Sequence, residues 1–271
     1  MTGTMVINIG WARAASTALR QNFLARHPDI VTAGSDQRVD EGPAATILSV
    51  LKTADDDEFR HRAPALRDLW DDYRRKTDGP VCLSDEELSI GLPGRTRPVV
   101  VARRCAELFP EARILAVVRE PVDAIGSFYG LAQRETFRDP TPFPDWLDRY
   151  FLAPSDGAGF AYLYAHGETL TAWGAGRPQA NMMVLDYRRL RTDPTGAYAN
   201  IARWLAVSEA ACEALPNSIV NASPAGPPTW PADRAAAIRA LYDADNRILA
   251  ETWGVDFNQS AIGDALLTDA V

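Results

Sequence analysis

A short segment near the start of the chain combines a cation with two hydroxyl groups. It reads GWARAASTAL over residues 10–19, with Arg13 shortly before Ser16 and Thr17. Several of its residues are small enough to let the backbone approach an anion closely: Ala12, Ala14 and Ala15. A helix that starts at the hydroxyl pair would add unpaired N–H groups and the positive end of its dipole. The segment therefore predicts an anion-binding loop.

A second segment, REPVDAIGSFY over residues 119–129, pairs another arginine with a hydroxyl. Arg119 comes at the predicted end of a strand, and Ser127 follows about two helical turns later. An arginine and a hydroxyl can hold a second phosphate through charge-assisted hydrogen bonds. Ligands of open parallel sheets bind beyond the carboxyl ends of the strands. We therefore expect both segments to face one crevice.

The two segments differ from the nucleotide-binding loop of kinases. That loop needs a Gly-Lys pair directly before its metal-binding hydroxyl, and no Gly-Lys pair occurs in the chain. No acidic residue that would complete a magnesium site stands out at a matching strand end. Two phosphate sites without a metal point to a nucleotide that carries both a 5′ group and a 3′-phosphate.

Apolar runs that alternate with amphipathic segments predict how these loops are positioned. Strands are expected at 5–9, 81–84, 114–118 and, with a turn, 181–190, and helices at 17–26, 98–110, 122–134, 195–207 and 232–254. The alternation predicts an α/β fold, a three-layer sandwich with a mostly parallel central sheet, similar to P-loop NTPases. We expect a single domain over residues 1–271.

Two stretches have a less regular pattern. Residues 35–79 are polar and irregular, and their charge run TADDDEFRHR (53–62) predicts a solvated helix face or a loop. Residues 135–165 are rich in aromatic residues and proline. They predict an insertion on the acceptor side of the core rather than a separate domain.

Composition excludes several classes of protein. With 46% hydrophobic residues the chain can form a sizeable core, and its formal charge of −8 argues against a nucleic-acid partner. Three cysteines without metal-like or paired spacing predict a reduced, intracellular setting. No apolar run approaches the length of a membrane span and no signal peptide is evident. We expect a cytoplasmic protein without a membrane partner.

The motifs resemble those of sulfotransferases that use 3′-phosphoadenosine 5′-phosphosulfate (PAPS). The family's 5′ motif, G-x-x-K-x-G-[ST]-[ST]-x-L, aligns with residues 10–19, and its 3′ motif, R-x-P-x-D-x-x-x-S-x-Y, matches residues 119–129 throughout. VLDYRRLRTDP (184–194) resembles the family's V-L-x-Y-E-x-L-x-x-D-P segment, with Arg188 in place of Glu. DADNRILAETWGVD (243–256) resembles its closing N-x-x-L helix. The resemblance covers most of the chain.

The resemblance implies a PAPS-dependent sulfotransferase, with PAPS as co-substrate and no metal. The backbone N–H groups of the first loop and its two hydroxyls would hold the 5′-phosphosulfate; these residues are Ala14, Ala15, Ser16, Thr17 and Ala18. Arg119 and Ser127 would hold the 3′-phosphate. Arg13 takes the place of the family lysine, near the bridging oxygen where negative charge grows as the sulfuryl group transfers.

Two departures from the family pattern bear on activity. Arg13 keeps the charge of the usual lysine but is an implausible proton donor. Ala15 replaces a glycine, which fits only if its φ is negative. Lys52 and Lys76 are the two lysines of the chain, and neither is placed to substitute for the family lysine.

The acceptor hydroxyl must lose its proton to a nearby base. LSDEEL (83–88) follows a predicted strand and resembles the S-x-E-x-L turn of several sulfotransferases that use a glutamate base. This resemblance assigns Glu86 as the base, although acidic residues in a turn can also be simply solvated. The alternatives are Glu87, Asp85 and the three histidines, His27, His61 and His166.

The sequence predicts a small-molecule or carbohydrate acceptor without naming it, and the net negative charge disfavours a polyanionic glycan. Six aromatic residues either line the acceptor pocket or form ordinary core: Phe143, Trp146, Tyr150, Phe151, Tyr162 and Tyr164. Two other functions stay open. One is an ATP-dependent kinase of the same fold, and the other is a nucleotide-binding protein that lost catalysis through Arg13.

Overall fold

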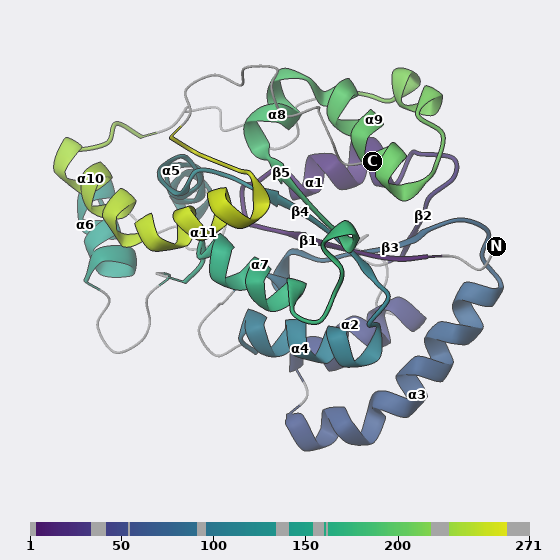
Figure 1. The fold of residues 1–271 in the computed structure, drawn as a ribbon. Helices are drawn as coiled ribbons and strands as arrows, with labels where there is room; N and C mark the ends of the chain where they lie inside the picture. Colours follow the sequence, from purple (N-terminus) through teal and green to yellow (C-terminus); the bar gives the residue numbers. More distant parts are fainter. Residues whose placement is uncertain are drawn as a thin grey trace.

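A parallel sheet forms the centre of the molecule (Figure 1). The computed structural model describes residues 4–33, 42–53, 55–90, 96–133, 141–153, 160, 162–217 and 228–258. Within these residues the sheet has the order β2-β3-β1-β4-β5, and every pairing is parallel. The strands are β1 (Met5–Gly10), β2 (Val31–Ala33), β3 (Val81–Ser84), β4 (Arg113–Val118) and β5 (Met182–Asp186).

Helices cover both faces of this sheet, so the predicted three-layer α/β fold is confirmed (Figure 1). In Figure 1, α2, α3, α4 and α7 lie below the sheet, and α1, α8 and α9 lie above it. In chain order the helices and short helical turns (η) are α1 (Ser16–Ala18), η1 (Leu19–Leu24), α2 (Pro43–Thr53), α3 (Asp56–Arg75), η2 (Glu86–Leu88), α4 (Pro98–Leu108), α5 (Pro121–Leu131), α6 (Phe143–Leu147), η4 (Asp148–Leu152), α7 (His166–Gly174), η5 (Gln179–Asn181), α8 (Tyr187–Thr192), α9 (Pro194–Leu205), η6 (Ala210–Ala214), α10 (Ala232–Leu241) and α11 (Asp243–Trp253).

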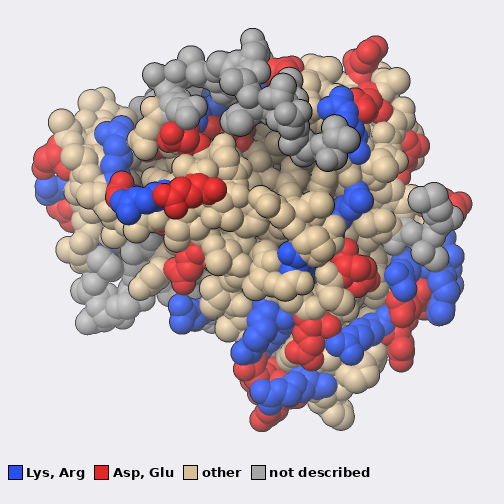
Figure 2. Space-filling model, viewed as in Figure 1, with Lys and Arg blue, Asp and Glu red and all other residues tan. Residues whose placement is uncertain are grey.

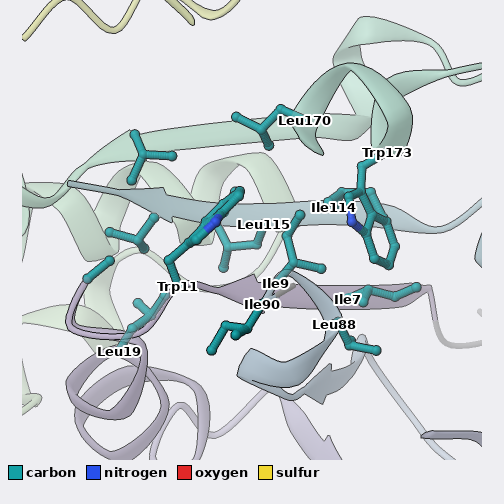
Figure 3. Packing of buried hydrophobic residues seen from close by; sticks show 14 of the residues in the cluster. Ile7, Ile9, Trp11, Leu19, Leu88, Ile90, Ile114, Leu115, Leu170 and Trp173 are labelled. Atoms are coloured by element: carbon teal, nitrogen blue, oxygen red, sulfur yellow. The ribbon is translucent and has the colours of Figure 1, made fainter. Parts of the chain in front are cut away.

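The core lies between the sheet and the helices. Ile7 of β1 is paired in register with Ile114 of β4, and both lie near Trp173 of α7 (Figure 3). All three side chains are at most 1% exposed. Burying an aliphatic side chain of this size contributes about 1.5–3 kcal/mol to stability. This packing fixes β1 and β4 relative to each other, and with them the loops that follow.

The register brings three strand ends to one edge of the sheet. Asn8 pairs with Ser84 at the end of β3, and Gly10 pairs with Val117 near the end of β4. The chain leaves β1 toward β2 and β3 on one side, and β4 lies on the other. β1 is therefore next to the point where the strand order reverses, which is where open α/β sheets bind ligands.

The irregular interpretation of residues 35–79 is wrong where the structure describes them, because two helices, α2 and α3, occupy most of the segment. Asp55 caps α3 by accepting a hydrogen bond from the Glu58 N–H at 2.7 Å. Phe59, Ala63 and Leu66 recur at helical spacing and are buried. The charge run forms the solvated start of α3, and basic and acidic side chains alternate over this region (Figure 2).

Three smaller corrections concern helix and strand bounds. The strand β2, only three residues long, was not predicted. The predicted helix 17–26 is a short α-helix that continues as a π-helical turn, η1. The predicted helix 232–254 is interrupted at Tyr242, which separates α10 from α11. In the part of the chain that the structure describes, no helix is both long and apolar enough to cross a membrane.

Candidate active site

The loop after β1 turns sharply before the first helix. Gly10 is required there, since a Cβ on it would lie 2.2 Å from the Cβ of Ser16. Arg13 and Ala15 both have left-handed backbone conformations, with φ of 65° and 64°. Ser16 then begins a helix whose first N–H groups have no partner within the helix. The helix therefore starts at the hydroxyl pair as the sequence predicts, while anion binding by this loop stays a prediction.

Alanine in place of the family glycine would fit without strain only at a negative φ, and Ala15 does not meet this condition, because its φ is 64°. An L-residue in this region costs about 1–2 kcal/mol, whereas glycine adopts it freely. We expect Ala15→Gly to raise the free energy of unfolding by up to about 1 kcal/mol, measured by urea denaturation. Ala18→Gly is the matched control: its φ is −65°, so glycine there should lower stability by about 0.5–1 kcal/mol. A loss of stability in Ala15→Gly would contradict the strain argument.

Side chains from elsewhere in the chain hold the carbonyl groups of this loop. The Tyr164 hydroxyl donates to the Ala12 carbonyl at 3.2 Å, and Arg119 Nη1 donates to the Arg13 carbonyl at 2.9 Å. Trp11 is fully buried and meets His166 edge to face, with ring centroids 4.6 Å apart. Because these anchors come from two distant segments, at residue 119 and at residues 164–166, tertiary packing fixes the conformation of the loop.

The loop after β4 starts α5 with a well-formed cap. The Glu120 carboxylate accepts a hydrogen bond from the Asp123 N–H at 2.7 Å. Pro121 occupies the first turn of the helix, where a backbone N–H would have no partner within the helix. Arg119 precedes this cap, and its guanidinium lies 4.3 Å from the ring centroid of Tyr187. Its Nε is buried, with no hydrogen-bond partner among the described residues. A buried, unpaired donor of this kind suits an anionic ligand.

The two predicted anion segments contact each other directly. Arg13 Nε donates to Ser127 Oγ at 2.9 Å, and Arg119 donates to the backbone of Arg13 as described above. Ser127 therefore contacts Arg13, which the sequence analysis had assigned to the other anion. The segments that follow β1 and β4 are thus joined by two hydrogen bonds.

The turn after β3 brings three carboxylates to the same edge. Asp85 caps η2 by accepting the Glu87 N–H at 2.8 Å. Lys52 of α2 binds the outer two carboxylates, at 2.7 Å from Asp85 and 2.9 Å from Glu87. Glu86 has a different neighbour, because the Ser16 hydroxyl donates to its Oε2 at 3.4 Å. Among the described side-chain contacts of these three acidic residues, that of Glu86 reaches the loop at residues 10–19, the candidate nucleotide loop.

Glu86 remains exposed by surface area, yet the protein around its carboxyl is enough to raise its pKa. Partial burial is the main cause, and the neighbouring charges of Asp85 and Glu87 add to it. The hydrogen bond from Ser16 and the charge of Arg20 act in the opposite direction. The result is a carboxylate with a higher proton affinity than an ordinary glutamate.

The three histidines have other surroundings. His27 is held by the Ser208 carbonyl at 2.9 Å and by the Asp29 N–H at 3.3 Å, and His61 lies exposed on α3. His166 is completely buried, and its Nε2 donates to the Arg119 carbonyl at 3.0 Å. Burial lowers the pKa of His166 to about 4, so the ring is neutral. His166 thus links the two loops and is not open to an acceptor.

Most of the candidate acceptor-pocket aromatics pack into the core. Phe143, Trp146 and Phe151 are buried within one cluster of rings, and Tyr150 stacks on Phe160. Tyr164 is buried as an anchor of the first loop. Tyr162 is 70% exposed. Of the insertion predicted at 135–165, residues 135–140, 154–159 and 161 lie outside the described residues.

Sequence reasoning missed two contacts at this site. Lys52 was considered only as a replacement for the family lysine, and it lies 33 positions before Asp85, too far for a local pattern to link it to the acidic turn. Tyr187 lies against Arg119, and its position directly after a strand marked it as a candidate.

Arg188, which departs from the family pattern, binds Asp186 through Nε at 2.7 Å. Among the described residues no cluster of three or more His, Cys, Asp or Glu could hold a metal ion.

Comparison with known proteins identifies the class. The sequence model of the sulfotransferase family matches residues 6–210 of the chain. This match spans well over half of the sequence, and the chain therefore belongs to the sulfotransferase family. No curated protein sequence matches closely enough to count as a relative.

Two solved structures support the same fold. A sulfotransferase from Alicyclobacillus acidocaldarius has a TM-score of 0.62 and 16% identity, over 95% of this chain and 98% of that one. Sulfotransferase STF9 from Mycobacterium avium has a TM-score of 0.51 and 14% identity, over 96% of this chain and 79% of that one. At this level of identity the similarity is one of fold.

Proposed function

We propose that the protein transfers a sulfuryl group from PAPS to a hydroxyl of a small-molecule or carbohydrate acceptor. The observation that carries the proposal is the convergence of two anion-binding segments and one carboxylate at the ends of β1, β4 and β3. Family membership supports sulfuryl transfer in general. The identity of the donor and the class of acceptor are our inference.

The polar groups of the site suit a nucleotide with phosphates at both ends of its ribose. The N–H groups at the start of α1 and the hydroxyls of Ser16 and Thr17 would bind the 5′-phosphosulfate. The buried Nε of Arg119 and the hydroxyl of Ser127 would bind the 3′-phosphate. Arg13 belongs to the first segment and contacts the second, since its Nε donates to Ser127 Oγ.

The chemistry then needs one proton transfer and one displacement. Glu86 takes the proton of the acceptor hydroxyl, whose oxygen forms a bond to sulfur as the bond from sulfur to the bridging oxygen breaks. The products are a sulfate ester, 3′-phosphoadenosine 5′-phosphate (PAP) and a protonated Glu86. The guanidinium of Arg13 stabilises the charge that grows on the bridging oxygen and donates no proton. In this proposal the chain acts as a single sulfotransferase domain without a metal.

Calorimetric titration with PAP, AMP, ADP and ATP tests the donor, followed by transfer from PAPS to a panel of hydroxyl acceptors in the presence of a chelator. We expect PAP to bind far more tightly than AMP, and transfer to persist without metal. Equal affinities for PAP and AMP would overturn the assignment of the donor. Metal-dependent phosphate transfer from ATP would identify a kinase. PAP binding without turnover on any acceptor would identify an inactive nucleotide-binding protein.

Arg119→Ala should remove most of the preference for PAP over AMP. A hydrogen bond to a charged group contributes about 1.5–3 kcal/mol, which corresponds to a loss of about 10–150-fold in PAP affinity. Arg119 also supports the Arg13 backbone, so AMP affinity serves as the internal reference for damage to the loop. Arg203→Ala, on an exposed arginine paired with Glu209, controls for overall charge. An unchanged ratio of PAP to AMP affinity would refute the role of Arg119.

A further inference from the structure

Lys52, in the last turn of α2, connects that helix to the acidic turn after β3. Its Nζ contacts Asp85 and Glu87, as described above, and its carbonyl accepts a hydrogen bond from Thr96 Oγ1. The side chains of Lys52 and Asp85 are only 20% and 16% exposed. Solvent therefore screens this ion pair less than a pair at the open surface.

Successive acidic side chains of this turn contact different elements of the fold. Asp85 and Glu87 bind Lys52, whereas Glu86, between them, receives the Ser16 hydroxyl. Ser89 Oγ donates to the Gly10 carbonyl at 2.5 Å and to the Glu86 carbonyl at 3.1 Å. The backbone of the turn is thus held against the end of β1, and Lys52 binds the flanking carboxylates.

The charges around Glu86 affect its ionisation. Asp85 and Glu87 both oppose ionisation of Glu86, and Arg20 of η1 favours it. Burial lowers the pKa of Lys52, but its hydrogen bonds and charge interactions with Asp85 and Glu87 outweigh this and raise the pKa overall. Lys52 therefore remains protonated and offsets two negative charges directly beside Glu86.

We propose that Lys52 is a positioning residue for Glu86: it binds the carboxylates on either side, keeps Glu86 facing the nucleotide loop, and offsets the negative charge of its two neighbours. This inference rests on the proposed role of Glu86 as the base. Lys52 touches neither the nucleotide loop nor Glu86 in the contacts given above, and acts through Asp85 and Glu87.

The first test needs no catalysis. The carboxyl ¹³C signal of Glu86 is titrated in the nucleotide-free protein and is identified by its loss in Glu86→Gln. We expect Lys52→Met to move this titration to higher pH, because two negative charges lose their counterion, and Lys52→Arg to restore it. Lys76→Met is the matched control, since Lys76 pairs with Asp72 on an exposed face of α3 and should leave the titration unchanged. An unshifted titration in folded Lys52→Met overturns the proposal.

The second test uses the rate of transfer. In Lys52→Met the acidic limb of the kcat profile should move to higher pH. At pH values below this limb, kcat should fall by on the order of 10-fold for each pH unit by which the limb moves. PAP affinity should stay unchanged, and the loss should diminish as the pH rises. A loss of kcat that is equal at all pH values would indicate general damage and would overturn the proposal. If the unaltered protein transfers no sulfuryl group, the proposed function fails, while the titration of Glu86 still decides the role of Lys52.

A double variant covers the case in which Lys52→Met does not fold. Asp85→Asn with Glu87→Gln removes the charges that Lys52 offsets, and asparagine retains the cap of η2. The positive charge of Lys52 is then unopposed, so the titration of Glu86 should move to lower pH. No movement in this variant overturns the proposal equally.

Discussion

Glu86→Gln should lower kcat by about 10²–10⁴-fold, the usual contribution of a positioned general base, while PAP affinity changes little. Glutamine keeps the shape of the side chain and can still accept the hydrogen bond from Ser16, but it cannot take the acceptor proton. The measurement is kcat with the acceptor on which the unaltered protein is most active, together with calorimetric affinity for PAP.

Neighbouring residues provide the comparison for this variant. Glu87→Gln should cost less than about 10-fold, because Glu87 binds Lys52 and does not contact the nucleotide loop in the described structure. His166→Ala should weaken nucleotide binding, since His166 supports the Arg119 carbonyl, without abolishing proton transfer. If Glu86→Gln retains full kcat, another group is the base.

The same assignment fixes the pH dependence of the unaltered protein. Glu86 acts only when ionised, and partial burial raises its pKa above the ordinary value of 4.5. Activity should therefore rise with pH through a limb that lies above 4.5, and should fall as the pH drops through it. Glu86→Gln should abolish this limb along with most of the activity.

Arg13→Ala should lose about 10²-fold or more in kcat, the cost of removing one donor from a developing oxyanion. Arg13→Lys should keep or raise activity, because it restores the cation that the family pattern has at this position. A guanidinium can bind Ser127 through one nitrogen and the bridging oxygen through another. The single ammonium group of lysine would give up the contact with Ser127 and keep its charge for the bridging oxygen. The rates are compared at saturating PAPS.

An arginine that follows η1, outside the loop at residues 10–19, controls for the loss of charge. Arg26 is exposed and donates to the Gln21 carbonyl, and Arg26→Ala should leave kcat unchanged. Arg13→Ala that loses PAP affinity but keeps kcat would make Arg13 a binding residue only. This outcome would leave the cradle of residues 14–18 intact as a proposal and would remove the proposed electrostatic stabilisation.

The sequence by itself determined the elements whose signals are local. Three of the strands were predicted within about one residue, because each is a short apolar run closed by a polar or glycine residue, and the fourth, β5, lies inside the strand and turn predicted at 181–190. The motif at 119–129 specifies its own helix start through Glu120 and Pro121. The prediction of an irregular segment at residues 35–79 was wrong although the sequence contains the signals of a helix, namely the cap and the apolar spacing of α3.

Only the tertiary structure decided which groups meet. No local pattern fixes the conformation of Ala15, because its positive φ is imposed by packing of the loop against Tyr164, Arg119 and Trp11. The contact between Arg13 and Ser127 joins residues more than 100 positions apart and depends on β1 lying beside β4. Likewise, the resemblance to the S-x-E-x-L turn points to Glu86 among three consecutive acidic residues, but their different contacts arise only in the tertiary structure, where Lys52 binds Asp85 and Glu87 and Ser16 donates to Glu86.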